Sequence, residues 1–412
     1  MALVIRSAIV SVCHPSRWCA CSENEAFNVL LLSASSDYVI AGRPRPGFPI
    51  LLNSDMTSCR EVNEFLRFYL LRAQIESKRS WEPISRALYD YFGFLEAHEL
   101  SWSDVARGEA KNLLAAYRDY SFETAKLARN TVILRITYIC EFYKYALRQG
   151  WIALLPYEYE RRQHIIRPSG FLGHLTTDGS TTIGNSAMPR RHRALIKFLS
   201  LEQARLLLGA ATNIHHAAII RTGLLTGMRR EEIATFPAAY VFDPGKPKAG
   251  QNSVSVTLDP ADGTGMQTKG SKARVIYMDR VVMHGLYRYK SLHRGERSSL
   301  TYDQYPNLFL NKDGQPFGGD GKGIEAIVRN LGKTVGIRAY PHILRHTYAT
   351  HTLHVLQQRQ SRGSRIEPLV FLQKQLGHSS IITTMEYLHL IDQVADGAAL
   401  AYDEELSFWK EA

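Results

Sequence analysis

Apolar residues recur with the period of an amphipathic α-helix in two long segments of the first half of the chain, and no other feature limits the possible folds as much. The two sets are Ile84, Leu88, Tyr91, Phe92 and Leu95, then Ile133, Ile136, Cys140, Tyr143 and Leu147. Residues at these spacings share one face of a helix, and that face must be buried against other elements. With candidate helices over 58–75 and 103–119, the pattern predicts a small all-helical domain.

Aromatic residues are frequent in these helices, and they allow two interpretations. The set is Tyr89, Tyr91, Phe92, Phe142 and Tyr143. They follow the apolar stripe, so we expect them to pack in the core rather than stack on bases.

Changes in composition along the chain predict four segments. Residues 1–55 are irregular or strand-containing, with short apolar runs at 28–32 and 50–52, and residues 56–158 form the helical domain. Residues 159–195 lose periodicity, are rich in Gly, Ser, Thr and Pro, and have basic ends, which is typical of a linker. That linker is either a solvated charged stretch or a crossing over DNA phosphates within a clamp. Residues 196–412 form the remaining domain with a C-terminal tail.

The last segment has helical patterns interrupted by one β-rich stretch. Ser200 and Gln203 have the spacing of a capping box at a helix start. Alternating residues over 253–258 and 273–278 predict two strands. The predicted fold class is therefore mainly α with a small β-sheet: an all-helical N-terminal domain and a mixed α/β C-terminal domain.

The charge balance points to a polyanionic partner. The 412 residues include 50 Lys and Arg against 39 Asp and Glu, a net charge of +11, and such an excess favours nucleic acid. No apolar run approaches the ~18 residues of a membrane helix. We therefore expect a soluble protein.

The cysteines argue against a disulfide framework, because five of them lie at irregular spacing in a long chain. The cluster of Cys13, His14, Cys19 and Cys21 has zinc-binding residue types, but no second ligand pair follows at a matching spacing. We expect no metal and no cofactor.

Four patches of the C-terminal domain carry residues suited to chemistry on a phosphate. They are TGMRREEI at 226–233, KGSKAR at 269–274, PHILRHTYATH at 341–351 and LGHSSIITTMEY at 376–387. An arginine near a helix start is commonly a surface ion pair, and a single tyrosine on a helix is commonly half-buried core. The four patches in this order, with His378 nine residues before Tyr387, resemble the tyrosine recombinase (phage integrase) family, of the mobile-element integrase type.

The residue types match the needs of phosphodiester cleavage. Attack on the phosphate builds a second negative charge, which the forks of Arg229 and Arg345 are suited to stabilise. The hydroxyl of Tyr387 is the predicted nucleophile and forms a covalent phosphotyrosine. The leaving 5′ oxygen needs a proton, and the resemblance assigns that role to Lys269 on the loop, with Lys272 as a rival.

Three further residues complete the predicted site. His342 lies three residues before Arg345 on the same helical face and is a candidate base or hydrogen-bond partner, while His378 supplies another donor to the phosphate. Glu232, three residues after Arg229, is expected to orient that arginine. His346 and His351 do not share a helix face well enough to form a metal pair. The polar stretch 357–365 is predicted to be a loop.

The resemblance implies a site-specific recombinase or integrase that cleaves and rejoins double-stranded DNA through a 3′-phosphotyrosine without metal. It also implies a cytoplasmic protein associated with the nucleoid of a prokaryotic host, and a homotetramer on DNA with accessory recombinases or DNA-bending proteins as further partners. Residues 391–412 would either fold back on their own domain or dock on a neighbouring protomer. A type IB topoisomerase-like enzyme and a DNA-binding accessory protein without catalysis are the alternatives.

Overall fold

The structure is a computed structural model of the chain, which divides into two units, Met1–Arg193 and Ala194–Ala412. It describes residues 29–71, 78–108, 112–163, 181–190, 196–246, 252–388 and 390. Cys13, His14, Cys19, Cys21 and the tail 391–412 lie outside these ranges. The described helices include none long and apolar enough to cross a membrane.

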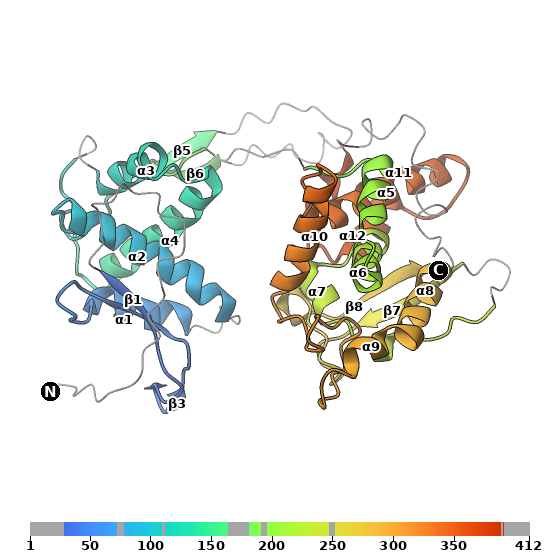
Figure 1. Ribbon diagram of the computed structural model, residues 1–412. Coiled ribbons are helices and arrows are strands. Elements are labelled where there is room, and N and C mark those ends of the chain that lie inside the picture. The colour runs from blue at the N-terminus through green and yellow to red at the C-terminus, as the bar shows by residue number, and fades with distance from the viewer. Residues whose placement is uncertain are drawn as a thin grey trace. The chain divides into compact units, whose positions relative to one another are not determined.

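The first unit is built on four α-helices (Figure 1). They are α1 (Arg60–Leu70), α2 (Trp81–Ala97), α3 (Leu113–Glu123) and α4 (Arg129–Arg148), with a short 3-10 helix η1 (Lys78–Ser80) before α2. The predicted faces of α2 and α4 meet in the core, where the hydroxyls of Tyr91 and Tyr143 lie 2.7 Å apart and Tyr143 donates to the Trp102 carbonyl at 3.0 Å. Tyr91, Phe142 and Tyr143 are fully buried, which confirms that these aromatic residues belong to the core.

A β-hairpin precedes the helices of this unit. Strands β1 (Leu30–Ser33) and β4 (Pro49–Leu52) pair antiparallel, and β2 (Val39–Ile40) pairs with β3 (Arg43–Pro44) nearer the tip. The buried side chain of Asn63 on α1 accepts from the Leu51 N–H at 2.8 Å and donates to the Leu51 carbonyl at 2.7 Å. The strand is thereby fixed to the helical core, so the strand-containing N-terminal segment and the helices share one unit.

A second hairpin lies within the stretch predicted as a linker. Strands β5 (Tyr159–Gln163) and β6 (Thr181–Asn185) pair antiparallel, with Tyr159 opposite Asn185. Ala187, just after β6, is buried in the core of the first unit. Part of the predicted linker is therefore ordered structure, and the boundary between the units falls after Arg193.

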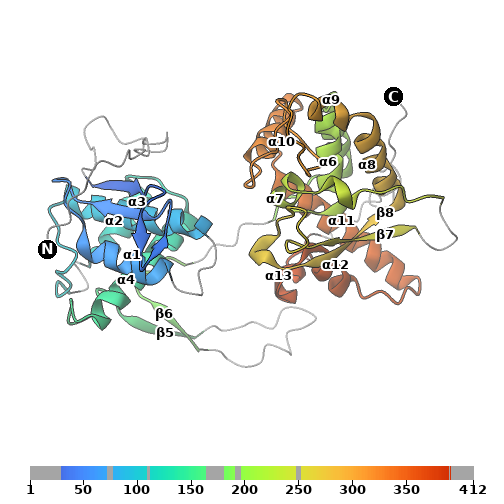
Figure 2. The ribbon, with the colours of Figure 1, turned by 90° about the horizontal axis from the view of Figure 1, so that it is seen from below.

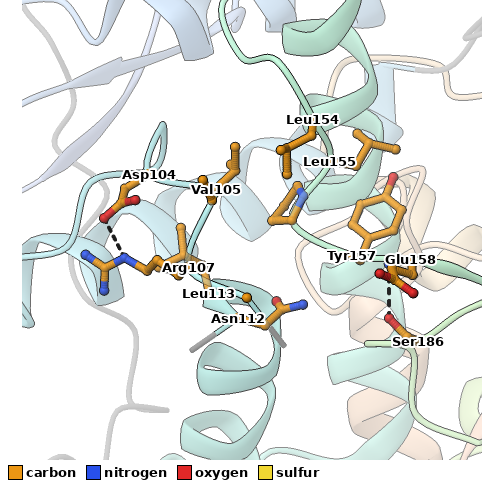
Figure 3. Close-up of a pocket in the computed structure, with 13 residues that line it drawn as sticks. Asp104, Val105, Arg107, Asn112, Leu113, Leu154, Leu155, Tyr157, Glu158 and Ser186 are labelled. Atoms are coloured by element: carbon orange, nitrogen blue, oxygen red, sulfur yellow. Dashed lines mark hydrogen bonds and ion pairs between the residues drawn. The ribbon is translucent and has the colours of Figure 1, made fainter. Parts of the chain in front are cut away.

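The first unit has a pocket between the segment after α2 and the segment after α4 (Figure 3). Leu154, Leu155 and Tyr157 form part of its apolar wall. Of its polar groups, Arg107 pairs with Asp104 at 2.6 Å, and the hydroxyl of Ser186 accepts from the Glu158 backbone N–H at 3.2 Å. The pocket resembles a packing hollow rather than a cluster of reactive groups, and all four motifs lie in the other unit.

Over its described residues, the second unit combines helices with a two-stranded sheet (Figures 1 and 2). Its first helices are α5 (Leu201–Ala210), α6 (Ile214–Thr226) and α7 (Arg230–Ala234), followed by the 3-10 helix η4 (Ala238–Tyr240). Strands β7 (Ser253–Leu258) and β8 (Arg274–Asp279) flank a loop with the 3-10 turn η5 (Lys269–Ser271). The remaining helices are α8 (Arg280–Leu292), α9 (Arg294–Ser298), α10 (Lys322–Thr334), α11 (Pro341–Ser361), α12 (Pro368–Leu376) and α13 (Ile381–Met385).

Local sequence signals explain several of these boundaries. Ser200 and Gln203 form the predicted capping box, with bonds of 3.2 and 3.0 Å. Strand β7 covers the predicted residues 253–258, and β8 is shifted by one residue from the predicted 273–278. The prediction of a loop over the whole of 357–365 is wrong, because residues 357–361 form the last turns of α11. These polar residues stay helical because they continue α11, whose preceding turns have a buried face.

Candidate active site

Arg229 lies just after a tight helix ending. Helix α6 ends at Gly227, whose φ of 65° is left-handed and suits glycine. A Cβ at Gly227 would lie 2.4 Å from Cδ1 of Tyr348, so no larger residue fits without movement. This close turn brings the chain into α7 with Arg229 at the N-terminal cap.

Glu232 holds Arg229 through both main chain and side chain. Its carboxylate accepts from the Arg229 backbone N–H at 2.6 Å and from Arg229 Nη1 at 3.0 Å. It also accepts two bonds from the guanidinium of Arg274, at 2.6 and 2.8 Å. Burial alone would raise the pKa of this fully buried carboxylate, but Arg274, Arg229 and Arg345 together hold that pKa below its usual value. Glu232 is therefore a charged anchor for two arginines.

Arg345 on α11 is 1% exposed and binds the ends of two other helices. Its Nη1 donates to the Gly227 carbonyl at 2.6 Å, and its Nη2 donates to the Leu376 carbonyl at 2.5 Å. Carbonyls at helix C-termini carry partial negative charge, which suits a cation. Burial, followed by the charge of Arg229, lowers the pKa of Arg345 to about 9, so the side chain stays charged at neutral pH.

Lys269 lies on the loop between β7 and β8. Leu258 pairs with Arg274, so residues 259–273 form one long connection, and no strand forms at 264–268. Lys269 and Lys272 are both exposed. The charge of Lys269 contributes, after burial and the charges of Arg345 and Arg229, to a lowered pKa of His342. Lys269 is therefore close enough to His342, three residues before Arg345, to act on it electrostatically.

Tyr387 follows α13 and is 2% exposed. Its hydroxyl lies 2.8 Å from Nδ1 of His346, which is one helical turn after His342 on α11. The rings of His342 and His346 meet edge to face, with centroids 4.2 Å apart. Burial raises the pKa of Tyr387 to about 12, and Glu386 acts in the same direction, while the charges of Arg345 and Arg229 oppose them.

His378 is the second histidine whose ring lies beside that of Tyr387. The two rings are parallel within 3° at a centroid distance of 6.3 Å, and Nδ1 of His378 lies 3.0 Å from the Thr384 hydroxyl. Burial and the charges of Arg345, Arg229, Arg274 and His342 lower the pKa of His378 to about 3. The imidazole is therefore neutral at physiological pH.

Gln375 connects the helix before His378 to the hairpin that carries Lys269. Its buried side chain accepts from the Tyr277 N–H at 2.8 Å and donates to the Tyr277 carbonyl at 2.9 Å, and it also donates to the Thr226 carbonyl at 3.3 Å. These bonds repeat the pairing that a neighbouring strand would make with β8. Gln375 thereby ties α12, β8 and the end of α6 together.

The second unit thus brings together six of the seven predicted residues, Arg229, Glu232, His342, Arg345, His378 and Tyr387, with Lys269 on an exposed loop beside them. The sequence interpretation missed three others: Arg274, His346 and Gln375. For His346 the signal was present, because it follows His342 by four residues and so shares its helix face. His351, by contrast, is buried with Nε2 3.0 Å from the Leu199 carbonyl. Among the described residues, no three His, Cys, Asp or Glu side chains are grouped in a way that could hold a metal ion.

Comparisons with known proteins find phage integrases and Xer recombinases. Residues 197–393 match the phage integrase family. Tyrosine recombinase XerD of Rhizobium meliloti (strain 1021) is 24% identical over 333 residues, which cover 76% of this chain and 85% of the relative. XerD of Bifidobacterium longum (strain NCC 2705) is 32% identical over 127 residues, 30% of this chain and 37% of the relative.

Solved structures share the fold at low sequence identity. The XerH site-specific recombinase in a post-cleavage complex with palindromic difH substrate has a TM-score of 0.52 at 17% identity, covering 86% of each chain. The Tn1549 transposon integrase in complex with circular intermediate DNA has a TM-score of 0.50 at 18% identity, covering 80% of this chain and 94% of the other. This similarity confirms the predicted mainly helical fold with small sheets. With its motifs assembled in the second unit, which holds the region that matches the phage integrase family, this chain is a tyrosine site-specific recombinase.

Proposed function

We propose that this recombinase cleaves one DNA strand by attack of the Tyr387 hydroxyl on a phosphodiester, which gives a 3′-phosphotyrosine and a free 5′ hydroxyl. The observation that carries the proposal is the position of Tyr387, a buried phenol within the electrostatic reach of Arg345 and Arg229 and hydrogen-bonded to His346. A phenol in such a site is shielded from water and held among cations that attract a phosphate.

The two arginines are the proposed receptors of the scissile phosphate. Arg345 uses two N–H groups on helix-end carbonyls, and a guanidinium has five, so others are left for phosphate oxygens. Arg229 donates from Nη2 to the Gly377 carbonyl at 3.2 Å and from Nη1 to Glu232 at 3.0 Å. Two fixed cations stabilise the second negative charge that develops in the transition state without any reorganisation.

Lys269 is the proposed general acid for the leaving 5′ oxygen. Its ammonium lies on an exposed loop and acts electrostatically on His342, next to Arg345. Lys272, three residues further along the same loop, is the alternative. His378 has its Nδ1 engaged with Thr384, which supports a role for Nε2 as a donor to the phosphate.

A nicked suicide substrate tests the proposal. Loss of a short fragment after cleavage traps the covalent adduct, so wild-type protein should accumulate protein–DNA complexes that survive denaturation. Tyr387→Phe keeps the ring and removes the nucleophile, so this variant should bind the same DNA and form no adduct. The adduct should form equally in the presence of a chelator such as EDTA. A Phe variant that still forms adduct would disprove the assignment of Tyr387.

For the assembly, we propose that both units clamp double-stranded DNA and that four protomers act on two sites in a mobile-element setting. The net charge of +11 supports a DNA partner, and a λ integrase structure is described as a dimer bound to a COC′ core site. A clamp over several phosphates predicts that log K falls by roughly 0.9 per neutralised phosphate for each log unit of salt. Mass measurements on the DNA complex should give four protomers per pair of sites, whereas a topoisomerase-like enzyme would relax DNA as a monomer.

A further inference from the structure

The hydroxyl of Tyr387 has a single hydrogen-bond partner within the described part of the chain, Nδ1 of His346 at 2.8 Å. Tyr387 is almost fully buried, and a buried O–H normally has an acceptor. Because a hydroxyl proton rotates towards its acceptor, the phenolic proton points at Nδ1, and the imidazole then carries its own proton on Nε2.

We infer that His346 is a catalytic residue that takes the phenolic proton of Tyr387 when the tyrosine oxygen attacks the DNA phosphorus. The inference rests on the phosphotyrosine chemistry proposed above. In the step, the Tyr387 O–H bond breaks and its proton passes to Nδ1, the tyrosine O–P bond forms, the P–O5′ bond breaks, and the 5′ oxygen receives a proton from the loop lysine. In rejoining, the 5′ hydroxyl attacks the phosphotyrosine, and the imidazolium returns the proton to the tyrosine oxygen.

The surroundings of His346 keep its imidazole in the state that this step needs. Burial is the main cause that lowers the pKa of His346 to about 3. The positive charges of Arg345 and of protonated His342 and His378 act in the same direction. The ring is therefore neutral at physiological pH and free to accept a proton. A bound phosphate adds negative charge beside these groups, which raises the pKa of the imidazole, and the phenolic O–H becomes a stronger acid as its oxygen bonds to phosphorus.

The other two histidines are in worse positions for this role. The His378 ring is parallel to the Tyr387 ring, and its Nδ1 is engaged with Thr384. His342 meets the His346 ring rather than the tyrosine, and no hydrogen bond joins His342 to Tyr387 in the described ranges. His342, predicted from the sequence as a base or hydrogen-bond partner, is therefore a neighbour that supports His346.

Two substitutions test whether His346 takes up a proton or only positions Tyr387. His346→Asn retains an acceptor oxygen near the position of Nδ1 but cannot take up a proton at neutral pH, and His346→Ala leaves space for a small base. His354→Gln is the matched control, because His354 is a buried histidine on the same helix that contacts Gln358 instead of Tyr387. The readouts are the single-turnover rate of adduct formation on the nicked substrate and the affinity for that DNA.

We expect His346→Asn and His346→Ala to lose about 100-fold or more in rate, the usual scale for a general base, with wild-type DNA affinity. Their residual rate should rise with pH about tenfold per unit, because the phenol must then ionise without help. Added imidazole should restore His346→Ala. The control should keep the wild-type rate.

Three results would overturn the inference. One is a wild-type rate in His346→Asn, which would assign His346 to orientation alone. Another is a rate in His346→Ala that neither responds to imidazole nor changes its pH dependence while DNA affinity is kept. The third is an equal loss in His354→Gln. Failure of the proposed function is distinct from these, because the wild-type protein itself would then form no adduct or Tyr387→Phe would form one.

Discussion

Glu232 and Arg274, which are 42 residues apart in the sequence, form a bidentate ion pair with N···O distances of 2.6 and 2.8 Å. The same carboxylate holds Arg229. Arg274 starts β8 directly after the loop with Lys269, so the pair joins the lysine loop to the first arginine. The position of Arg229 thus depends on Arg274, which shares the Glu232 carboxylate with it.

Replacing Arg274 by Met should destabilise the protein by about 1–3 kcal/mol, because the buried Glu232 carboxylate loses two hydrogen bonds while Arg229 still pairs with it. The free energy of unfolding, measured with urea, checks this. Arg329→Met is the matched control, because Arg329 pairs with Glu325 at an exposed site, and such pairs contribute about 0–1 kcal/mol. Equal losses in the two variants would contradict the anchoring role of Glu232.

Removal of either arginine fork should slow cleavage without abolishing DNA binding. Arg229→Ala and Arg345→Ala should each lose at least ~100-fold in the rate of adduct formation, as found when one charge-stabilising donor is removed from a transition state. Single-turnover assays on the nicked substrate measure the rate, and gel shifts measure affinity. A rate near that of the wild type for either variant would exclude that arginine from the phosphate site.

The identity of the general acid can be settled with a modified substrate. A 5′-phosphorothiolate has a leaving group that needs no proton, so it should restore cleavage by Lys269→Ala to the wild-type rate on the same substrate. Lys272→Ala should cleave the normal oxygen substrate well. If the sulfur substrate instead rescues only Lys272→Ala, the assignment belongs to Lys272.

Gly227 should tolerate no side chain. Gly227→Ala combines a left-handed backbone with a Cβ placed 2.4 Å from Tyr348, and we expect a loss of about 2–5 kcal/mol from strain and overpacking together. Gly150→Ala is the control, since Gly150 has φ of 71° but nothing within 4 Å of the new Cβ. It should show the backbone strain alone, and a similar loss at both positions would rule out the packing contribution.

The stability of the second unit should fall as the pH drops below about 6.5. His346 and His378 both have pKa values lowered to about 3 in the folded chain, so the unfolded chain binds more protons between pH 3 and 6.5. Their contribution is fully present above pH 6.5 and is lost as the pH falls through this window. Unfolding measured between pH 5 and 7 should show a shallower slope for His378→Asn than for the wild type. An unchanged slope would contradict the burial of neutral His378.

The sequence predicts the fold class and the main site residues because both depend on local signals. The helical faces of α2 and α4, the strands around 253–278 and the motifs around Arg229, Arg345 and Tyr387 can all be found from spacing. Arg274 and Gln375 were missed because their roles arise from partners far along the chain, Glu232 and Tyr277, which periodicity does not reveal. The contact of His346 with Tyr387 depends on how α13 returns to α11, which the spacing of the two residues does not reveal. The polar composition of residues 357–361 predicts a loop, but they continue a helix whose preceding turns are buried.

The Gln375 amide also affects the strand edge of β8, where another copy of the chain could pair. The sheet of the second unit has two strands, and an unpaired strand edge can recruit an extended segment of another molecule. At Tyr277 that edge is already occupied by a side chain that offers one donor and one acceptor, as a third strand would. Gln375→Leu would leave the Tyr277 N–H and carbonyl without these partners beneath α12. The residue that joins α12 to the hairpin thus also fills the position that a third strand would take at Tyr277.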